Sequence, residues 1–166
     1  MNFSKNLKNT IFTKEIITSL TIIIGSFFLD RISKISVIKH QINNDGVYFV
    51  NDYLNFDLIW NTGIGFGLFS HNANVYYHVI SFLIFLVIGF VSYLITRSNF
   101  TKKVLFSLIL GGALGNFYDR LFYFAVPDFI DIHIDNFHWF TFNIADIFIT
   151  VGVILLITKD LFVKKK

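Results

Sequence analysis

The sequence predicts an integral membrane protein, an all-α bundle of four transmembrane helices. First, 54% of its 166 residues are hydrophobic, 22 are Phe and only 15% are charged, which exceeds what a soluble core of this size needs. Second, four apolar segments are each about 20 residues long, the length that crosses a bilayer core of about 30 Å. Third, the basic residues gather at alternate ends of these segments, as they do in multi-pass membrane proteins.

The four segments run approximately over residues 15–37, 75–96, 104–124 and 139–158. The second contains no Asp, Glu, Lys or Arg over 22 residues, whereas polar side chains interrupt the other three. The chain has one Pro, no internal repeat and no Ser- or Gly-rich linker. We therefore expect residues 1–166 to form a single integral membrane domain.

The distribution of charge predicts that both termini are cytoplasmic. Ten of the fourteen Lys and Arg lie before the first segment, between the second and third, or after the fourth. Nine of the eleven acidic residues fall in or beside the two stretches on the other side, 30–74 and 119–138. The net charge of +3 therefore reflects topology rather than nucleic-acid binding. No A-x-A-like site follows the first apolar stretch, so we do not expect a cleaved signal sequence.

Ionisable residues inside the apolar segments cost about 2.5–3.5 kcal/mol each on insertion scales, so each needs a partner or a function. Asp30 and Lys34 are four residues apart and can pair on one helix face. Taken alone, this spacing favours an interfacial ion pair with Lys34 extending outward to the headgroups.

A second polar group ends the third segment, in the stretch GGALGNFYDR. Gly111 and Gly115 form a small-xxx-small surface that allows another helix to approach closely. Asn116, Asp119 and Arg120 follow at spacings of three and four residues, so they lie on nearly one side of the helix. The pattern fits a role in joining helices and a role in a functional site equally well.

Two aspartates stand apart from the other acidic residues. Asp146 follows Asn143 by three residues in an apolar helix, with no Lys or Arg within twelve residues on either side. Between Phe129 and Asp135 apolar and polar residues alternate, which predicts an extended segment with Asp131 facing water. Asp128 has the opposite parity, so it is expected to point toward the membrane or the core.

Two carboxylates in a poorly hydrated site repel each other and hold a single proton between them near neutral pH. One carboxylate can then deprotonate a water molecule while the other protonates a carbonyl or a departing amine, as in aspartic proteases. The chain has no Cys, no H-E-x-x-H and no G-x-S-x-G, and its five histidines show no convincing ligand spacing. Paired acids within the membrane also occur in proton-coupled transporters and in structural membrane proteins, and the residues alone leave these alternatives open.

The polar clusters, taken in order, resemble the motifs of the lipoprotein signal peptidase family, also called signal peptidase II, a bacterial integral membrane aspartic protease. The matching stretches are DRISK, NTGIGF, GGALGNFYDR, VPDFI and FNIAD, which together span most of the chain. The resemblance implies a four-helix transmembrane bundle with a small extracytoplasmic β-cradle and a short amphipathic lid. Cradle and lid would come from about residues 40–69 and 129–138.

The resemblance assigns the catalytic pair to Asp128 and Asp146, the two aspartates that parity and helix position also distinguish. It implies that Asn143 orients Asp146. The other positions that match family motifs, expected to support the site or to bind the substrate backbone, are Asn61, Gly63, Asn116, Asp119, Arg120, Asp30 and Lys34. Of these, Asp30 and Lys34 are expected to be largely structural.

The resemblance also implies the reaction and the location. The substrate would be a prolipoprotein whose Cys carries a diacylglyceryl group, cut on the N-terminal side of that Cys to release the signal peptide. The enzyme would act as a monomer in the bacterial inner membrane with its site at the extracytoplasmic surface, without metal or cofactor, and globomycin would inhibit it. One departure is NTGIGFG, where Gly65 and Gly67 should loosen a loop that helps to close the site.

Overall fold

A computed structural model describes residues 3–43, 46–63 and 74–163 of the chain. Four helices and four strands alternate in groups along the sequence. The helices are α1 (Phe3–Asn43), α2 (Asn74–Arg97), α3 (Phe100–Phe122) and α4 (Ile144–Val163). The strands are β1 (Tyr48–Asn51), β2 (Leu54–Asn61), β3 (Val126–Ile134) and β4 (Phe137–Phe142).

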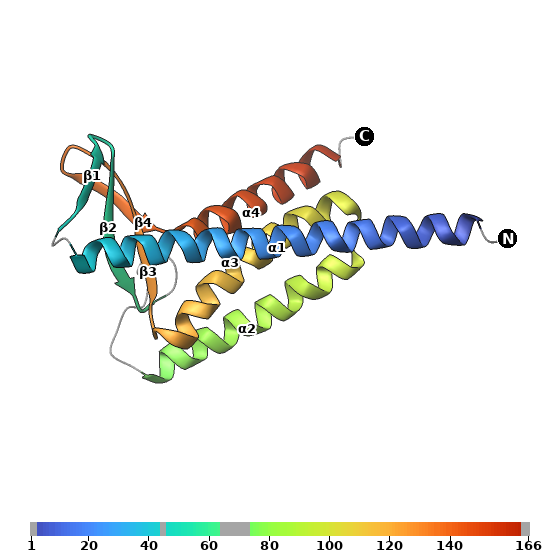
Figure 1. Cartoon of the computed structure of the whole chain (residues 1–166), viewed down its shortest axis with the longest axis horizontal. Helices are drawn as coiled ribbons and strands as arrows, with labels where there is room; N and C mark the ends of the chain where they lie inside the picture. Colours follow the sequence, from blue (N-terminus) through green and yellow to red (C-terminus); the bar gives the residue numbers. More distant parts are fainter. Residues whose placement is uncertain (1–2, 44–45, 64–73, 164–166) are drawn as a thin grey trace.

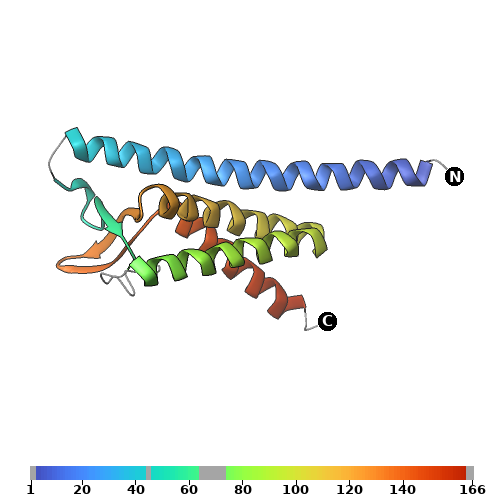
Figure 2. The same ribbon diagram turned by 90° about the horizontal axis from the view of Figure 1, so that it is seen from below.

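The helices form a bundle with the sheet at one end (Figure 1). Both termini and the short connection between α2 and α3 lie at the opposite end. Helix α1 runs along one side of the other three helices (Figure 2), and α3 contacts α1, α2 and α4. The bundle therefore separates the basic chain ends from the end that carries the sheet.

Polar side chains fill much of the interior of the bundle, while apolar side chains cover its outside. The buried polar residues include Ser26, Asp30, Lys34 and Ser107, whereas long rows of Ile, Leu, Val and Phe on α1, α2 and α4 are exposed. This arrangement suits a protein surrounded by lipid. Within the described residues, two helices, Thr13–Asn43 and Tyr77–Arg97, are long and apolar enough to cross a membrane by length and composition.

Close contact between helices depends on the glycines of α3, as the small-xxx-small pattern predicts. A Cβ atom at Gly111 would lie 2.8 Å from the Ile23 carbonyl oxygen of α1, and one at Gly115 would lie 2.6 Å from an Asp30 carboxylate oxygen. On the other side of α3, a Cβ at Gly112 would lie 2.6 Å from the Ala145 carbonyl oxygen of α4. Larger side chains at these positions would push the helices apart.

The sheet is antiparallel, with strand order β1-β2-β3-β4, so β3 is an inner strand. Asp135 and Asn136 connect β3 to β4, because Ile134 pairs with Phe137, and Asp135 adopts a φ of +50° that suits such a tight turn. The expected small sheet is therefore present. Part of the region predicted to supply the lid, residues 64–69, lies outside the described residues, as do Gly65 and Gly67.

Two predictions from the sequence are wrong in this region. The fourth span was expected from residue 139, but 139–142 belong to β4 because the aromatic and β-branched residues of FHWFTF pair with β3. Asp131 was expected to face water, yet it is buried, while Ile132 and Ile134 are exposed. Burial alternates along residues 131–134 as predicted, but the covered face is the one that carries Asp131 and His133, so alternation alone did not show which face is buried.

Candidate active site

Asp128 lies where the sheet meets the bundle. It occupies the buried first half of β3, where it pairs with Ile59 of β2, and only 4% of its surface is exposed. Its two carboxylate oxygens accept hydrogen bonds from the side-chain amides of Asn143, at 2.6 Å, and Asn61, at 2.9 Å. Burial raises the pKa of Asp128 to about 6, with a further rise from the charge of Asp146, against these two bonds, which lower it.

Asp146 is the third residue of α4, and Asn143 caps that helix. The Asn143 side-chain oxygen accepts a bond from the Asp146 backbone N–H, and the Asp146 carboxylate accepts one from the Asn143 backbone N–H, both at 3.1 Å. This reciprocal pair is a capping box, and it satisfies N–H groups that a helix start leaves free. The position at the helix N-terminus also favours a negative charge on Asp146.

Asn143 joins the two carboxylates through different atoms of one fully buried side chain. Its amide nitrogen donates to Asp128, while its oxygen holds the first turn of α4 that carries Asp146. Because the amide is fixed at both ends, it also sets the separation and orientation of the two acids. The orienting role that the resemblance implies for Asn143 stays a prediction, for which these contacts supply a physical basis.

Asn116 of α3 holds the other side of Asp146. Its amide nitrogen donates to the Asp146 carboxylate at 2.7 Å, and its oxygen accepts from the Lys34 ammonium at 2.8 Å. The amide is thus oriented by a charge on one side and positions a carboxylate on the other. This contact connects the aspartate pair to the charges between α1 and α3.

Arg120 connects α3 to the end of β2. Its guanidinium donates to the Gly63 carbonyl and to the Asn116 carbonyl, both at 3.1 Å, and its Nε has no hydrogen-bond partner among the described residues. The Gly63 N–H in turn donates to the Asn61 side chain at 2.9 Å. Tyr77 of α2, which the sequence did not single out, donates its hydroxyl to the Arg120 carbonyl.

A fully buried ion cluster lies below the site, between α1 and α3. The Lys34 ammonium is 2.9 Å from Asp30 and 2.7 Å from Asp119, and Arg31 contacts both of these carboxylates. The pairing of Asp30 with Lys34 is confirmed, but the expectation that Lys34 extends to the headgroups is wrong. Lys34 is completely buried because Asp119 and Asn116 of α3 cover its ammonium group.

Arg31 is a member of this cluster that sequence reasoning missed. It lies within the DRISK stretch but one residue from Asp30, off the helix face that the spacing of Asp30 and Lys34 defines. Two acids and two bases make the cluster neutral, which is the condition for burying charge at low cost. DRISK carries two basic residues and one acidic residue, so burying all three predicts an acidic partner from elsewhere in the chain, which here is Asp119.

Asp30 extends the cluster to the aspartate pair. Its second carboxylate oxygen accepts the Ala145 backbone N–H at 3.0 Å, so an aspartate of α1 also caps the first turn of α4. The structure therefore brings every candidate site residue into one connected network. They are Asp128, Asp146, Asn61, Gly63, Asn116, Asp119, Arg120, Asn143, Asp30 and Lys34.

A buried and a half-buried acid that lie close together, each with amide partners, can share a proton and act as general base and general acid on one water molecule. The network leaves the carboxylates oriented by neutral amides rather than neutralised by direct ion pairs. Such an arrangement suits hydrolysis of an amide at the junction of the bundle and the sheet.

Comparison with known proteins identifies the family of the chain. Residues 22–162 match the family described as Signal peptidase (SPase) II. The chain is 45% identical to the lipoprotein signal peptidase of Pelagibacter ubique (strain HTCC1062) over 159 residues, which cover 95% of this chain and 96% of that protein. It is 46% identical to the lipoprotein signal peptidase of Francisella tularensis subsp. novicida (strain U112) over 121 residues, or 70% and 75% of the two chains.

Solved structures show the same fold. A bacterial membrane enzyme determined by the in meso method at 2.3 Å resolution superposes with a TM-score of 0.72 and 31% identity, covering 87% of each chain. A second, at 1.9 Å resolution, gives a TM-score of 0.72 and 30% identity, covering 87% of this chain and 92% of that one. The fold is that of a membrane enzyme with helices and a small antiparallel sheet, and the chain belongs to the signal peptidase II family of aspartic proteases.

Proposed function

We propose that this protein removes the signal peptide from diacylglyceryl-modified prolipoproteins, cutting on the N-terminal side of the lipidated Cys, with Asp128 and Asp146 as its catalytic pair. Family membership supports the reaction. The observation that carries the assignment of residues is the shared partner Asn143, which binds one carboxylate with its amide nitrogen and caps the turn that carries the other. Of the acidic residues described, these two are the ones that one buried amide links.

The proposed reaction needs one proton on the pair. The ionised carboxylate takes a proton from a water molecule, whose oxygen attacks the scissile carbonyl carbon, while the protonated carboxyl donates its proton to the carbonyl oxygen. The tetrahedral intermediate then collapses as its C–N bond breaks: the departing amine receives the proton that the pair took from water, and a hydroxyl of the intermediate returns a proton to the other carboxylate as the carbonyl re-forms, which restores the single proton of the pair. A pKa of about 6 for Asp128 is suited to this exchange, because proton transfer is easiest when the pKa lies near the working pH.

Each supporting residue has a role that follows from its contacts. Asn116 and Asn143 orient Asp146 and Asp128, and Asn61 holds the outer oxygen of Asp128. Arg120 holds the Gly63 carbonyl and thereby the end of the loop that follows β2. The ion cluster of Asp30, Lys34 and Asp119 supports the first turn of α4, because Asp30 accepts a hydrogen bond from the backbone of that turn.

The proposed setting is the bacterial inner membrane, with one domain over residues 1–166 and four crossings. The exposed apolar surfaces of the helices and the position of the sheet at the end away from both termini support cytoplasmic termini and an extracytoplasmic site. A site at the membrane surface would admit the diacylglyceryl group laterally from the lipid. We expect the enzyme to act as a monomer and to be inhibited by globomycin.

The test is cleavage of a diacylglyceryl-modified prolipoprotein by the purified full chain in detergent. Asp128→Asn and Asp146→Asn should each abolish cleavage, because each removes acid–base capacity with little change in shape. Asp135→Asn is the matched control, since Asp135 is an exposed aspartate at the turn that follows β3, and it should cleave as the wild type does. Cleavage that survives either of the first two substitutions would overturn the pair, and a folded wild type without activity would favour the transporter or structural alternative.

A further inference from the structure

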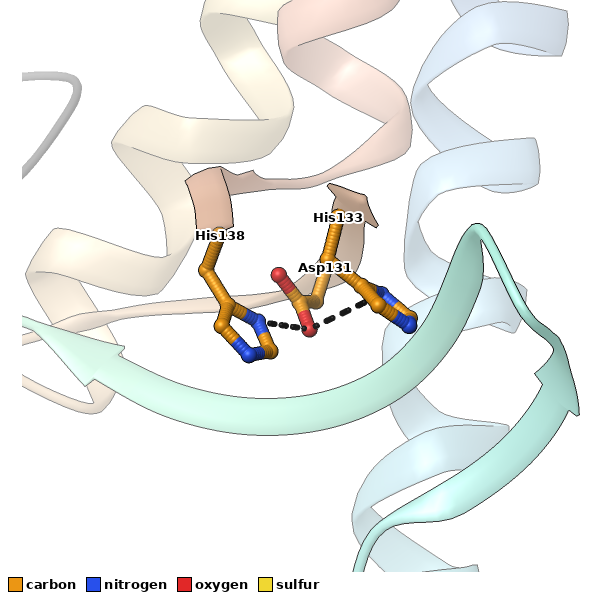
Figure 3. A group of neighbouring side chains, drawn as sticks. All are labelled: Asp131, His133 and His138. Carbon is orange, nitrogen blue, oxygen red and sulfur yellow. Dashed lines mark hydrogen bonds and ion pairs between the residues drawn. The ribbon is translucent and has the colours of Figure 1, made fainter. Parts of the chain in front are cut away.

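Three side chains that the sequence did not connect meet on the outer part of the sheet (Figure 3). Asp131 and His133 are two residues apart on β3 and therefore point to the same face, and His133 pairs directly with His138 of β4. Each offers a ligand atom, and these atoms all lie within 4.8 Å of one another. The position of the turn at Asp135 and Asn136 sets the register that brings the two histidines together.

The cluster contains a buried ring nitrogen without a partner. His133 is only 9% exposed, and its Nδ1 makes no hydrogen bond among the described residues. That atom lies 3.6 Å from the Asp131 carboxylate oxygen, too far for a good hydrogen bond. The same oxygen lies 2.8 Å from Nδ1 of His138. A buried polar atom of this kind commonly marks a missing water or ion, and here it faces a carboxylate and a second imidazole.

We propose that Asp131, His133 and His138 bind a divalent transition-metal ion, with Zn²⁺ as the best fit. Two imidazoles and one carboxylate are a ligand set that zinc uses, with bonds of about 2.0–2.2 Å. Tetrahedral geometry at those bond lengths separates neighbouring ligand atoms by roughly 3.3 Å. The observed separations of 2.8 and 3.6 Å lie on either side of this value, so small side-chain movements would complete the site.

Burial and access also suit a metal. Asp131 is 5% exposed and is thus held in place, whereas the His138 side chain is 57% exposed and leaves a path for the ion and for a water as fourth ligand. The two histidine rings are nearly parallel, with centroids 5.1 Å apart, and both present Nδ1 to the same carboxylate oxygen. A hydrogen bond between His138 and Asp131 alone would leave the buried nitrogen of His133 unsatisfied, and a bound ion satisfies all three side chains.

The bound ion would fasten β3 to β4. Two ligands come from β3 and one from β4, so the metal closes the hairpin that leads from Asp128 directly into the cap of α4 at Asn143. The role is structural, because none of the three ligands contacts Asp128 or Asp146 in the described structure. The site therefore stabilises the sheet beside the catalytic pair without taking part in hydrolysis.

The experiment uses the full chain purified in detergent without a histidine tag, stripped of metal with a chelator that is then removed. Zn²⁺ is titrated by calorimetry, and Co²⁺ is added separately as an absorption probe of tetrahedral coordination. We expect one Zn²⁺ per chain with micromolar or tighter affinity, and at least about tenfold weaker binding in His133→Ala and in His138→Ala. The matched control is His78→Ala, an exposed histidine of α2, which should bind as the wild type does.

Melting temperature provides a second readout. Zinc at about a hundredfold above its Kd should raise the Tm of the wild type by about 5 °C and leave the Tm of His138→Ala unchanged. His138 is exposed, so its loss should not prevent folding even if His133→Ala does. The proposal is wrong if millimolar zinc does not bind, or if His138→Ala binds zinc as tightly as the wild type. Neither result bears on the cleavage reaction, which is measured separately with the aspartate variants.

Discussion

Replacing Asn143 should change both the pH dependence of cleavage and the stability of α4, and two substitutions separate these effects. Asn143→Ser keeps a side chain that caps helices well but is too short to reach Asp128. Asn143→Ala removes the cap and the bond to Asp128 together. Comparing Asn143→Ser with the wild type therefore isolates the 2.6 Å hydrogen bond that Asn143 donates to the Asp128 carboxylate, and comparing it with Asn143→Ala isolates the helix cap.

The expected change in the pKa of Asp128 follows from the free energy of this hydrogen bond. A buried hydrogen bond to a charged group contributes about 1.5–3 kcal/mol, and about 1.4 kcal/mol corresponds to one pKa unit. The bond favours the ionised form, so its loss should raise the pKa of Asp128 from about 6 by a further 1–2 units, roughly. Both variants should therefore shift the pH profile of kcat/KM toward higher pH by a similar amount. Only Asn143→Ala should also lose the capping contribution, about 1 kcal/mol.

The assay is cleavage of the lipidated substrate across a pH series, with thermal melting of the same preparations. An unchanged pH profile in Asn143→Ser would refute the idea that this amide tunes Asp128. Equal melting temperatures for the two variants would refute the capping role. A purely structural contribution from Asn143 would lower stability and total activity without moving the profile along the pH axis.

Three further predictions follow from burial and close contact. Gly115→Ala should destabilise the protein by about 1–3 kcal/mol and reduce cleavage, because the added methyl group would lie 2.6 Å from an Asp30 carboxylate oxygen. The control Gly89→Ala, whose added methyl group would have no atom within 4 Å, should melt at or above the wild-type temperature. The pKa of Asp128 is raised from 3.8 to about 6, so the folded protein binds this proton more tightly than the unfolded chain does. The resulting stability is fully present below pH 3.8, and about 3 kcal/mol is lost as the pH rises through 6. Melting temperatures of the wild type should fall over this pH range, and those of Asp128→Asn should not. Lys34→Met should cost about 3–5 kcal/mol by leaving two buried carboxylates without their shared cation, and a melting temperature close to that of the wild type would contradict the buried cluster.

The sequence could identify the catalytic candidates because each carried a local anomaly. Asp146 had no basic residue near it in an apolar helix, and Asp128 had the wrong parity for a water-facing aspartate. The spacing of Asp30 and Lys34 correctly predicted a pair on one helix face. The helical spacings depend on distances of a few residues along one element, where periodicity is reliable, whereas the parity argument for Asp128 used a strand whose buried face was assigned wrongly.

The sequence failed where contacts depend on how elements pack together. Burial of Lys34 follows from the approach of α3, which no spacing within α1 reveals. Exposure of Ile132 follows from which face of β3 the rest of the molecule covers, and alternation along the strand does not reveal that face. The meeting of His133 and His138 could have been found, because a two-residue turn at Asp135 and Asn136 places those histidines opposite each other.

The neutral cluster between α1 and α3 also constrains how the chain can enter the membrane. The three cluster members on α1 carry a net charge of +1, and Asp119 on α3 carries the balancing charge. In the proposed topology, either helix inserted alone would hold unmatched charge at about 2.5–3.5 kcal/mol per residue. The first helix is therefore expected to reach its final position in the membrane only after α3 has been synthesised. Its depth then depends on Asp119, which lies more than 80 residues further along the chain.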